Sequence, residues 1–161
     1  MGRKKPSRWA SILKETRGGV LALVALFLPI AVLCVGMVVD LGTMFFVRKA
    51  VQAACDLGAL AGVQELDWDL LGLGMVVLRQ VEAEAIAKEI ADHNLEALEA
   101  LVQDLHVSAT VLNPPAKAEP TVAVAVTYSV QMPFLRTVPG LTEEFRDRRV
   151  SEASVVKRTE W

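Results

Sequence analysis

The sequence has little of what catalytic and metal sites require. It contains only two histidines and two cysteines in 161 residues. His93 and His106 belong to different expected elements and lack the close His, Cys or carboxylate spacing that is typical of a zinc site. The acidic stretch around Asp67 lacks the glycine and the distal glutamate of a calcium-binding EF-hand loop. Neither a phosphate-binding glycine loop nor a nucleophile elbow is present. We therefore expect no catalytic residue, no cofactor and no metal, and we expect that the protein is not an enzyme.

The cysteines also fail to predict a disulfide framework. Cys34 and Cys55 are 21 residues apart, which on one helix places them about 30 Å apart along the axis. A disulfide needs Cα atoms within about 7 Å of each other. Cys34 is expected to be an apolar residue that faces lipid or another helix. For Cys55 two interpretations stay open, a small packed residue and a cross-link between two copies in an oxidising compartment.

Charge is absent from residues 20–39, an uninterrupted run of 20 residues. That is the length a helix needs to cross the roughly 30 Å of hydrocarbon in a bilayer. Pro29 lies within the run, and transmembrane helices tolerate proline. The run is longer than the apolar region of a cleaved signal peptide, which is about 7 to 15 residues. It therefore predicts a transmembrane helix that also acts as an uncleaved anchor.

The charges around the run predict its orientation. Basic residues precede it, opposed only by Glu15, and basic flanks remain in the cytoplasm; they are Arg3, Lys4, Lys5, Arg8, Lys14 and Arg17. From Asp40 onward, 18 acidic residues stand against 11 basic ones, which argues against a nucleic-acid partner. The prediction is a cytoplasmic tail (1–17), a transmembrane helix (18–39) and an exterior module (40–161) of a single-pass protein in the cytoplasmic (inner) membrane.

Small residues mark one edge of the chain after the run. Ala50, Ala54, Gly58 and Gly62 recur at a spacing of four. Residues 40–64 contain no proline, so one helix from about residue 19 to about residue 64 is expected. Alanine and glycine allow helix backbones to approach closely. The edge therefore predicts a close partner, which could be a second helix, the sheet, or the same segment of another copy; packing within the chain is the favoured interpretation.

The remaining sequence predicts an α+β fold. The stretch "DWDLLGLG" is expected to be a turn. An amphipathic helix is expected over about residues 75–101, with a break at "DHN" before "LEALEALVQDL". Strands are expected around residues 107–111, 122–130 and 149–157, because their larger apolar residues alternate with small or polar ones. One-sided strands of this kind favour an antiparallel sheet. The helix is expected to use an apolar face made of Val77, Val81, Ala85, Ile86 and Ile90.

Two carboxylates are candidates for interaction. Asp40 ends the apolar run, and the favoured interpretation is an interfacial residue that marks where the helix enters water. The alternative is an ion pair with a basic residue of a neighbouring subunit. Asp56 lies among small residues in mid-helix, where a buried carboxylate would need a donor such as Arg48 or Lys49. Exposure of Asp56 to solvent is the equal alternative.

Residues 17–62 resemble a known family. The stretch "RGGVLALVALFLPIAVLCVGMVVDLGTMFFVRKAVQAACDLGALAG" is similar to the N-terminal segment of the TadG-like and TadE-like proteins of Flp (tight adherence) pilus assembly. The residues that carry the resemblance are Arg17, Gly18, Pro29, the "VDLG" of residues 39–42, Phe45, Arg48, Gln52, Ala54, Asp56, Ala59, Leu60, Ala61 and Gly62.

The resemblance implies a membrane-anchored, pilin-like and non-enzymatic accessory protein of a pilus and secretion system. Its implied partners are membrane lipid and other pilus assembly proteins or pseudopilins, with a homo-oligomer as a further alternative. Pilins of this system that are processed carry a glutamate five residues after a glycine cleavage point, where this chain has Leu23 or Val24. An unprocessed protein is therefore expected. A processed minor pseudopilin in the filament and a regulatory subunit of an envelope enzyme are the alternatives.

Overall fold

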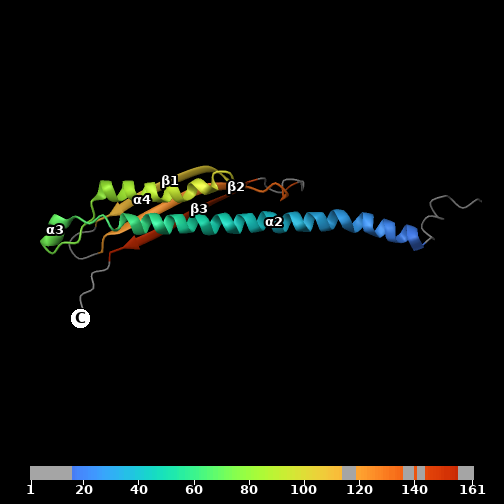
Figure 1. The fold of residues 1–161 in the computed structure, drawn as a ribbon, viewed down its shortest axis with the longest axis horizontal. Helices are drawn as coiled ribbons and strands as arrows, with labels where there is room; N and C mark the ends of the chain where they lie inside the picture. Colours follow the sequence, from blue (N-terminus) through green and yellow to red (C-terminus); the bar gives the residue numbers. More distant parts are fainter. Residues whose placement is uncertain (1–15, 114–118, 136–139, 141–143, 156–161) are drawn as a thin grey trace, which may run out of the picture.

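The computed structural model describes residues 16–113, 119–135, 140 and 144–155, which form an α+β fold around one long helix (Figure 1). The elements in chain order are α2 (Thr16–Gly62), α3 (Trp68–Gly72), α4 (Gln80–Leu95), the short 3-10 helix η1 (Glu96–Leu98), β1 (Val102–Leu112), β2 (Thr121–Gln131) and β3 (Glu144–Ser154). The α+β prediction, with a long N-terminal apolar helix, a further helix and a three-stranded antiparallel sheet, is confirmed. The first 15 residues of the predicted basic tail and the end of the predicted third strand, residues 156 and 157, lie outside the described residues.

Helix α2 runs without interruption through Pro29 and past the end of the apolar run. Its first half is exposed on all sides, whereas its second half lies against the rest of the fold (Figure 1). Among the described residues, α2 is the single helix long and apolar enough to cross a membrane. The large apolar side chains of residues 20–39 that the fold leaves exposed, such as Leu21 and Phe27, therefore suit a surrounding of lipid.

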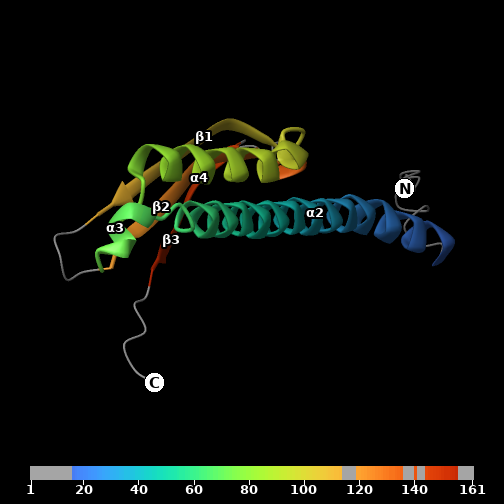
Figure 2. The same cartoon turned by 60° about the vertical axis from the view of Figure 1, so that its left-hand side comes forward.

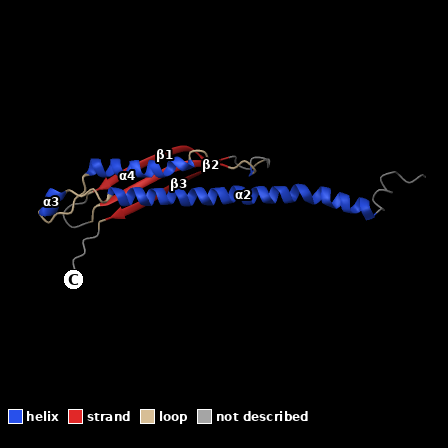
Figure 3. Ribbon diagram, viewed as in Figure 1, coloured by secondary structure: helices blue, strands red, loops and turns tan. Residues whose placement is uncertain are grey.

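The sheet is an antiparallel meander with β2 in the centre (Figure 3). Strand β2 buries alternate residues because helices cover one face of the sheet only; the buried residues are Val122, Val124, Val126, Tyr128 and Val130. Helix α2 packs over β2 and β3, and α4 packs over β1 and β2. The core lies in this layer between the two helices and the sheet.

Helix α4 runs antiparallel to the second half of α2 and beside it (Figure 2). The predicted apolar face of this helix is wrong at two positions, since Val81 is 77% exposed and Ala85 is exposed as well, whereas Val77, Ile86 and Ile90 are half-buried. The buried stripe instead consists of Ala83, Ala87, Ala91 and Leu95. Gly58 and Gly62 of α2 bring the axes of the two helices close together. At that separation, only the small side chain of alanine fits opposite the glycines.

The ends of the elements also differ from the prediction. Residues 77–79 are extended rather than helical because they form a bridge to the segment after α2, with the N–H of Arg79 donating to the carbonyl of Glu65 at 2.9 Å. The predicted turn "DWDLLGLG" contains the short helix α3, whose first N–H groups are capped by the Asp67 carboxylate. At the other end of α4, residues 102–105 belong to β1 and not to a helix, since Val102 pairs with Val130 of β2.

Strand β1 contains an irregularity near its start. Its register against β2 shifts between Gln103 and His106, and Asp104 in between has a φ of 51°. Asparagine and aspartate accept this left-handed conformation more readily than most residues. The shift lets the strand begin five residues earlier than the alternation of residues 107–111 predicts.

Candidate helix-packing and interaction site

One face of α2 carries nearly all of its contacts with the rest of the protein. The buried positions fall on one side of the helix and form a single stripe along it; they are Gly36, Asp40, Val47, Val51, Ala54, Cys55, Gly58, Ala59 and Gly62. The stripe begins inside the apolar run and continues to the last residue of the helix. The same face of α2 therefore contacts the rest of the fold both within the apolar run and beyond it.

The predicted small-residue edge lies on this face. Ala54, Gly58 and Gly62 are buried and Ala50 is half-buried. A Cβ added to Gly58 would lie 2.6 Å from the carbonyl oxygen of Ala87 and 3.1 Å from the Cβ of Ala91. The partner on this edge is thus the second helix of the same chain.

At Gly62 the sheet joins the contact. A Cβ there would lie 2.9 Å from Cγ1 of Val122 and 3.0 Å from the Ala83 carbonyl oxygen. The two glycines thus let α2 approach the backbone of α4 and the central strand. The exposed Gly42 has no heavy atom within 4 Å of such a Cβ.

Asp40 lies in the interior and not in water, with 1% of its surface exposed. Its Oδ2 accepts a hydrogen bond from the backbone N–H of Leu135 at 2.6 Å. Its Oδ1 is buried, and no described residue forms a hydrogen bond with it. The carboxylate therefore fastens the segment that follows β2 to α2, immediately beyond the apolar run.

Asp56 lies on the opposite side of α2 and is exposed. Its Oδ1 accepts a hydrogen bond from Nε2 of Gln52, one turn earlier, at 3.0 Å. Arg48, which the sequence offers as a donor to it, forms its ion pair elsewhere. Asp56 is thus a surface residue that does not bind another element of the described chain.

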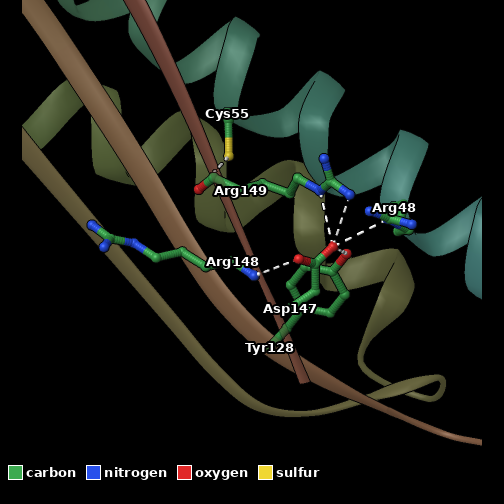
Figure 4. A network of polar contacts seen from close by, with 6 residues as sticks. All are labelled: Arg48, Cys55, Tyr128, Asp147, Arg148 and Arg149. Carbon is green, nitrogen blue, oxygen red and sulfur yellow. Dashed lines mark hydrogen bonds and ion pairs between the residues drawn. The ribbon is translucent and has the colours of Figure 1, made fainter. Parts of the chain in front are cut away.

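A polar network joins α2 to β2 and β3 (Figure 4). Oδ2 of Asp147 lies 3.2 Å from Nε of Arg48 and 2.8 Å from Nη2 of Arg149. The same oxygen accepts a hydrogen bond from the hydroxyl of Tyr128 at 3.3 Å. Oδ1 of Asp147 accepts one from the backbone N–H of Arg148 at 2.9 Å. One carboxylate therefore serves four donors from three elements.

This network shifts the pKa values of its members. Burial alone would raise the pKa of Asp147, but the Arg148 N–H and the Arg149 guanidinium outweigh it, and the pKa is lowered. Burial raises the pKa of Tyr128. Burial would lower the pKa of Arg149, but the Tyr128 hydroxyl and the Asp147 carboxylate outweigh it and raise the pKa. Asp147 is thus held ionised between two cations.

Cys55 is packed beneath β3, with its Sγ 4.0 Å from the carbonyl oxygen of Arg149. Burial, together with the nearby Asp56 charge, raises the pKa of the thiol from 9.0 to about 11. The thiolate is the reactive form of cysteine. A buried thiol with a raised pKa is unsuited to cross-linking two copies, which favours the first of the two interpretations of Cys55.

We predict that Cys55 resists alkylation in the folded protein. The test protein carries Cys34→Ser, so that Cys55 is its single thiol. The control carries Cys34→Ser, Cys55→Ser and Ala53→Cys, which places the single thiol at an exposed position two residues earlier. At neutral pH, maleimide should modify Cys55 at least several-fold more slowly than the control cysteine. Intact mass against time measures both rates. Rapid modification of Cys55 without unfolding would contradict its burial.

The two histidines belong to no metal-binding cluster among the described residues. Within the part of the chain that the structure describes, no group of three or more His, Cys, Asp or Glu residues could hold a metal ion. His93 is strongly exposed, and its Nδ1 lies 3.5 Å from Oε1 of Glu96 on the same helical segment. His106 is exposed on β1. These positions supply no candidate catalytic or cofactor-binding constellation.

The sequence did not indicate three of the residues that hold the fold to α2. Asp147 and Arg149 occupy inward positions of β3, where an apolar pattern would be expected. Phe134 lies against Gly36, in a loop that showed no periodicity. The run "FRDRR" of residues 145–149 could have indicated Asp147 and Arg149, because its charges occupy both faces of a strand.

The comparison with known families concerns α2 and the turn after it. Residues 18–65 match a family model described as Putative Flp pilus-assembly TadE/G-like. We call these residues the TadE/G-like segment. No curated protein and no solved structure matches the chain. The resemblance in the sequence is thereby confirmed, and it relates the chain to Flp pilus assembly.

The TadE/G-like segment covers less than a third of the chain, and its exterior half carries the packing edge. Ala50, Ala54, Gly58 and Gly62 all fall within it, as do Asp40 and Asp56. The part that contacts α4 and the sheet is therefore the same part that the family model describes.

Proposed function

We propose that this protein is a membrane-anchored accessory protein of Flp/Tad-type pilus assembly that acts through protein contacts and catalyses no reaction itself. The observation that carries the proposal is the single helix α2. Its TadE/G-like segment combines an exposed apolar half with a half that supports an α+β module. Such a helix suits a subunit that presents a folded module at a fixed place above the membrane.

Anchoring is supported by length, composition and exposure. A helix of the uncharged residues 20–39 is as long as the hydrocarbon core is thick. Nearly all of the surface of these residues is free of contact with the module. The basic tail before them favours a cytoplasmic N-terminus, which places the module on the outer side of the inner membrane.

Action through contacts is supported by the outer face of α2 beyond the membrane. Phe46 is 59% exposed, Leu57 48% and Leu60 53%. Other pilus assembly proteins or pseudopilins are the proposed partners along this face, and a second copy of the chain is the alternative.

Deletion of the gene from its own organism tests the role. Loss of surface pili, restored by the wild-type gene, is the expected result, and electron microscopy with pilin immunoblotting of sheared cell-surface fractions measures it. A photo-crosslinking amino acid at Leu57 or Leu60 should then capture a pilus component, while one at the exposed Val150 on the far sheet face serves as the matched control. Normal piliation after deletion would contradict the proposed role.

Intact mass separates the accessory protein from a processed pseudopilin. The membrane-extracted protein is expected to retain the residues before Gly18 and Gly19. A mass that lacks them, together with the protein's presence in purified filaments, would favour the processed minor pseudopilin instead.

A further inference from the structure

The segment that follows β2 reaches back along α2 into the apolar run. A Cβ added to Gly36 would lie 2.6 Å from Cδ1 of Phe134 and 2.7 Å from its Cγ, so the aromatic ring lies directly on the glycine. The next residue, Leu135, donates its N–H to Asp40. Two successive residues of the module are therefore fixed to α2 one turn apart.

These contacts define how deep the segment lies. Gly36 precedes Asp40 by four residues and belongs to the uncharged residues 20–39. At a rise of 1.5 Å per residue, it lies about 6 Å further into the membrane than the carboxylate. A ring that packs on Gly36 must share that depth.

A second turn of the module reaches almost the same level. Residues 99–101, which connect η1 to β1, and the first two residues of β1 line a groove with Val39, Asp40, Gln131 and Pro133. Val39 is the last residue of the uncharged run. In Figure 1 this end of the module, where β2 ends, is the part that lies furthest along α2 toward its apolar half.

Both turns present apolar surface at this end. Phe134 is 42% exposed and Leu101 is 41% exposed. Aromatic and large aliphatic side chains gain free energy when they enter the boundary between headgroups and acyl chains. Under the proposed anchoring, the apolar half of α2 beside these side chains already lies in lipid.

We propose that the membrane-facing end of the module, residues 99–101 and 132–135, is seated in the outer leaflet at the boundary between headgroups and acyl chains. Lipid covers the exposed surfaces of Phe134 and Leu101. Asp40 and Gly36 act as positioning residues, because they fix the loop to α2 at that depth. The inference rests on the proposed membrane anchoring, and it adds a second point of lipid contact formed by the folded module.

Tryptophan fluorescence in lipid vesicles tests this contact on the full-length chain. The three native tryptophans are replaced by phenylalanine, and single reporters are introduced as Phe134→Trp or Leu101→Trp. Phe27→Trp reports the transmembrane segment, and Val150→Trp on the exposed sheet face is the matched control. Each protein is reconstituted in phosphatidylcholine that is unlabelled, brominated near the headgroup, or brominated near the acyl-chain ends.

The expected result is quenching of Phe134→Trp and Leu101→Trp that is several-fold stronger than that of Val150→Trp. Lipid brominated near the headgroup should quench them most, whereas Phe27→Trp should respond most to the deeper bromines. Two independent loop reporters keep the test valid if one substitution disturbs its turn. Quenching of Phe27→Trp alone would overturn the seated loops and leave the anchor intact. Absence of quenching at Phe27→Trp as well would overturn both the anchor and the inference.

Discussion

Gly58→Ala is expected to destabilise the protein although alanine is the better helix former. In an open helix this substitution gains up to about 1 kcal/mol. Here the new methyl group would lie 2.6 Å from the carbonyl oxygen of Ala87, a backbone atom that cannot rotate away. Overpacking of this kind costs about 1–3 kcal/mol, so the clash outweighs the gain. Gly58→Leu is expected to force α4 away from α2 altogether.

Thermal unfolding of the full chain in detergent micelles, followed by circular dichroism, measures the effect. The matched control is Gly42→Ala on the same helix, because nothing lies within 4 Å of a Cβ at that position. Gly42→Ala should melt at the wild-type temperature or slightly above it, and Gly58→Ala several degrees below. Equal melting temperatures for both variants would show that α2 and α4 are not in close contact.

Asp147→Ala is expected to produce the second large loss, because one carboxylate serves donors from α2, β2 and β3. Without it, the buried Tyr128 hydroxyl loses its acceptor, and the guanidinium groups of Arg48 and Arg149 face each other without an anion. Hydrogen bonds to a charged group contribute about 1.5–3 kcal/mol. Glu144→Ala on the same strand removes only an exposed ion pair at 3.7 Å to Arg146 and should cost less than about 1 kcal/mol.

The effect of Asp147 should depend on pH in a defined direction. Its pKa is lower in the folded chain than its ordinary value of 3.8, so the folded state binds the proton less readily than the unfolded state. The stabilisation is therefore complete above pH 3.8 and declines as the pH falls through the lower, folded-state pKa. The difference in unfolding free energy between wild type and Asp147→Ala should shrink in acid. A difference that stays constant or grows would contradict the network.

Periodicity in the sequence predicted the elements that bury one regular face. Strand β2 is the clearest case, since its valines and Tyr128 alternate with small residues and all face the helices. The long helix α2 was predictable because no breaker other than Pro29 interrupts it. Its small edge also correctly indicated close packing, although several partners were compatible with it.

The pattern failed where contact geometry, rather than hydrophobicity, selects the buried residue. On α4 the larger Val81 is exposed while Ala83 is buried, because the glycines of α2 leave room for a methyl group and no more. On β3 the inward positions hold Asp147 and Arg149, which obscured the start of the strand at Glu144. Neither choice can be read from one segment alone, since each depends on the surface of another.

The contact between Phe134 and Gly36 belongs to the same class. A loop residue and a glycine inside an apolar run are about a hundred positions apart and share no motif. Only the path of β2, which ends beside the apolar half of α2, brings them together. Neither residue was therefore among the predicted interaction sites.

The unbroken course of α2 has a mechanical consequence. A helix of 47 residues is about 70 Å long, and the structure places no hinge along it from Thr16 to Gly62. The module packs against one side of the outer half of α2. A tilt or axial rotation of the apolar half would therefore turn the module by the same angle. Under the proposed membrane anchoring, a neighbour that tilts the apolar half of α2 would therefore move the module with it.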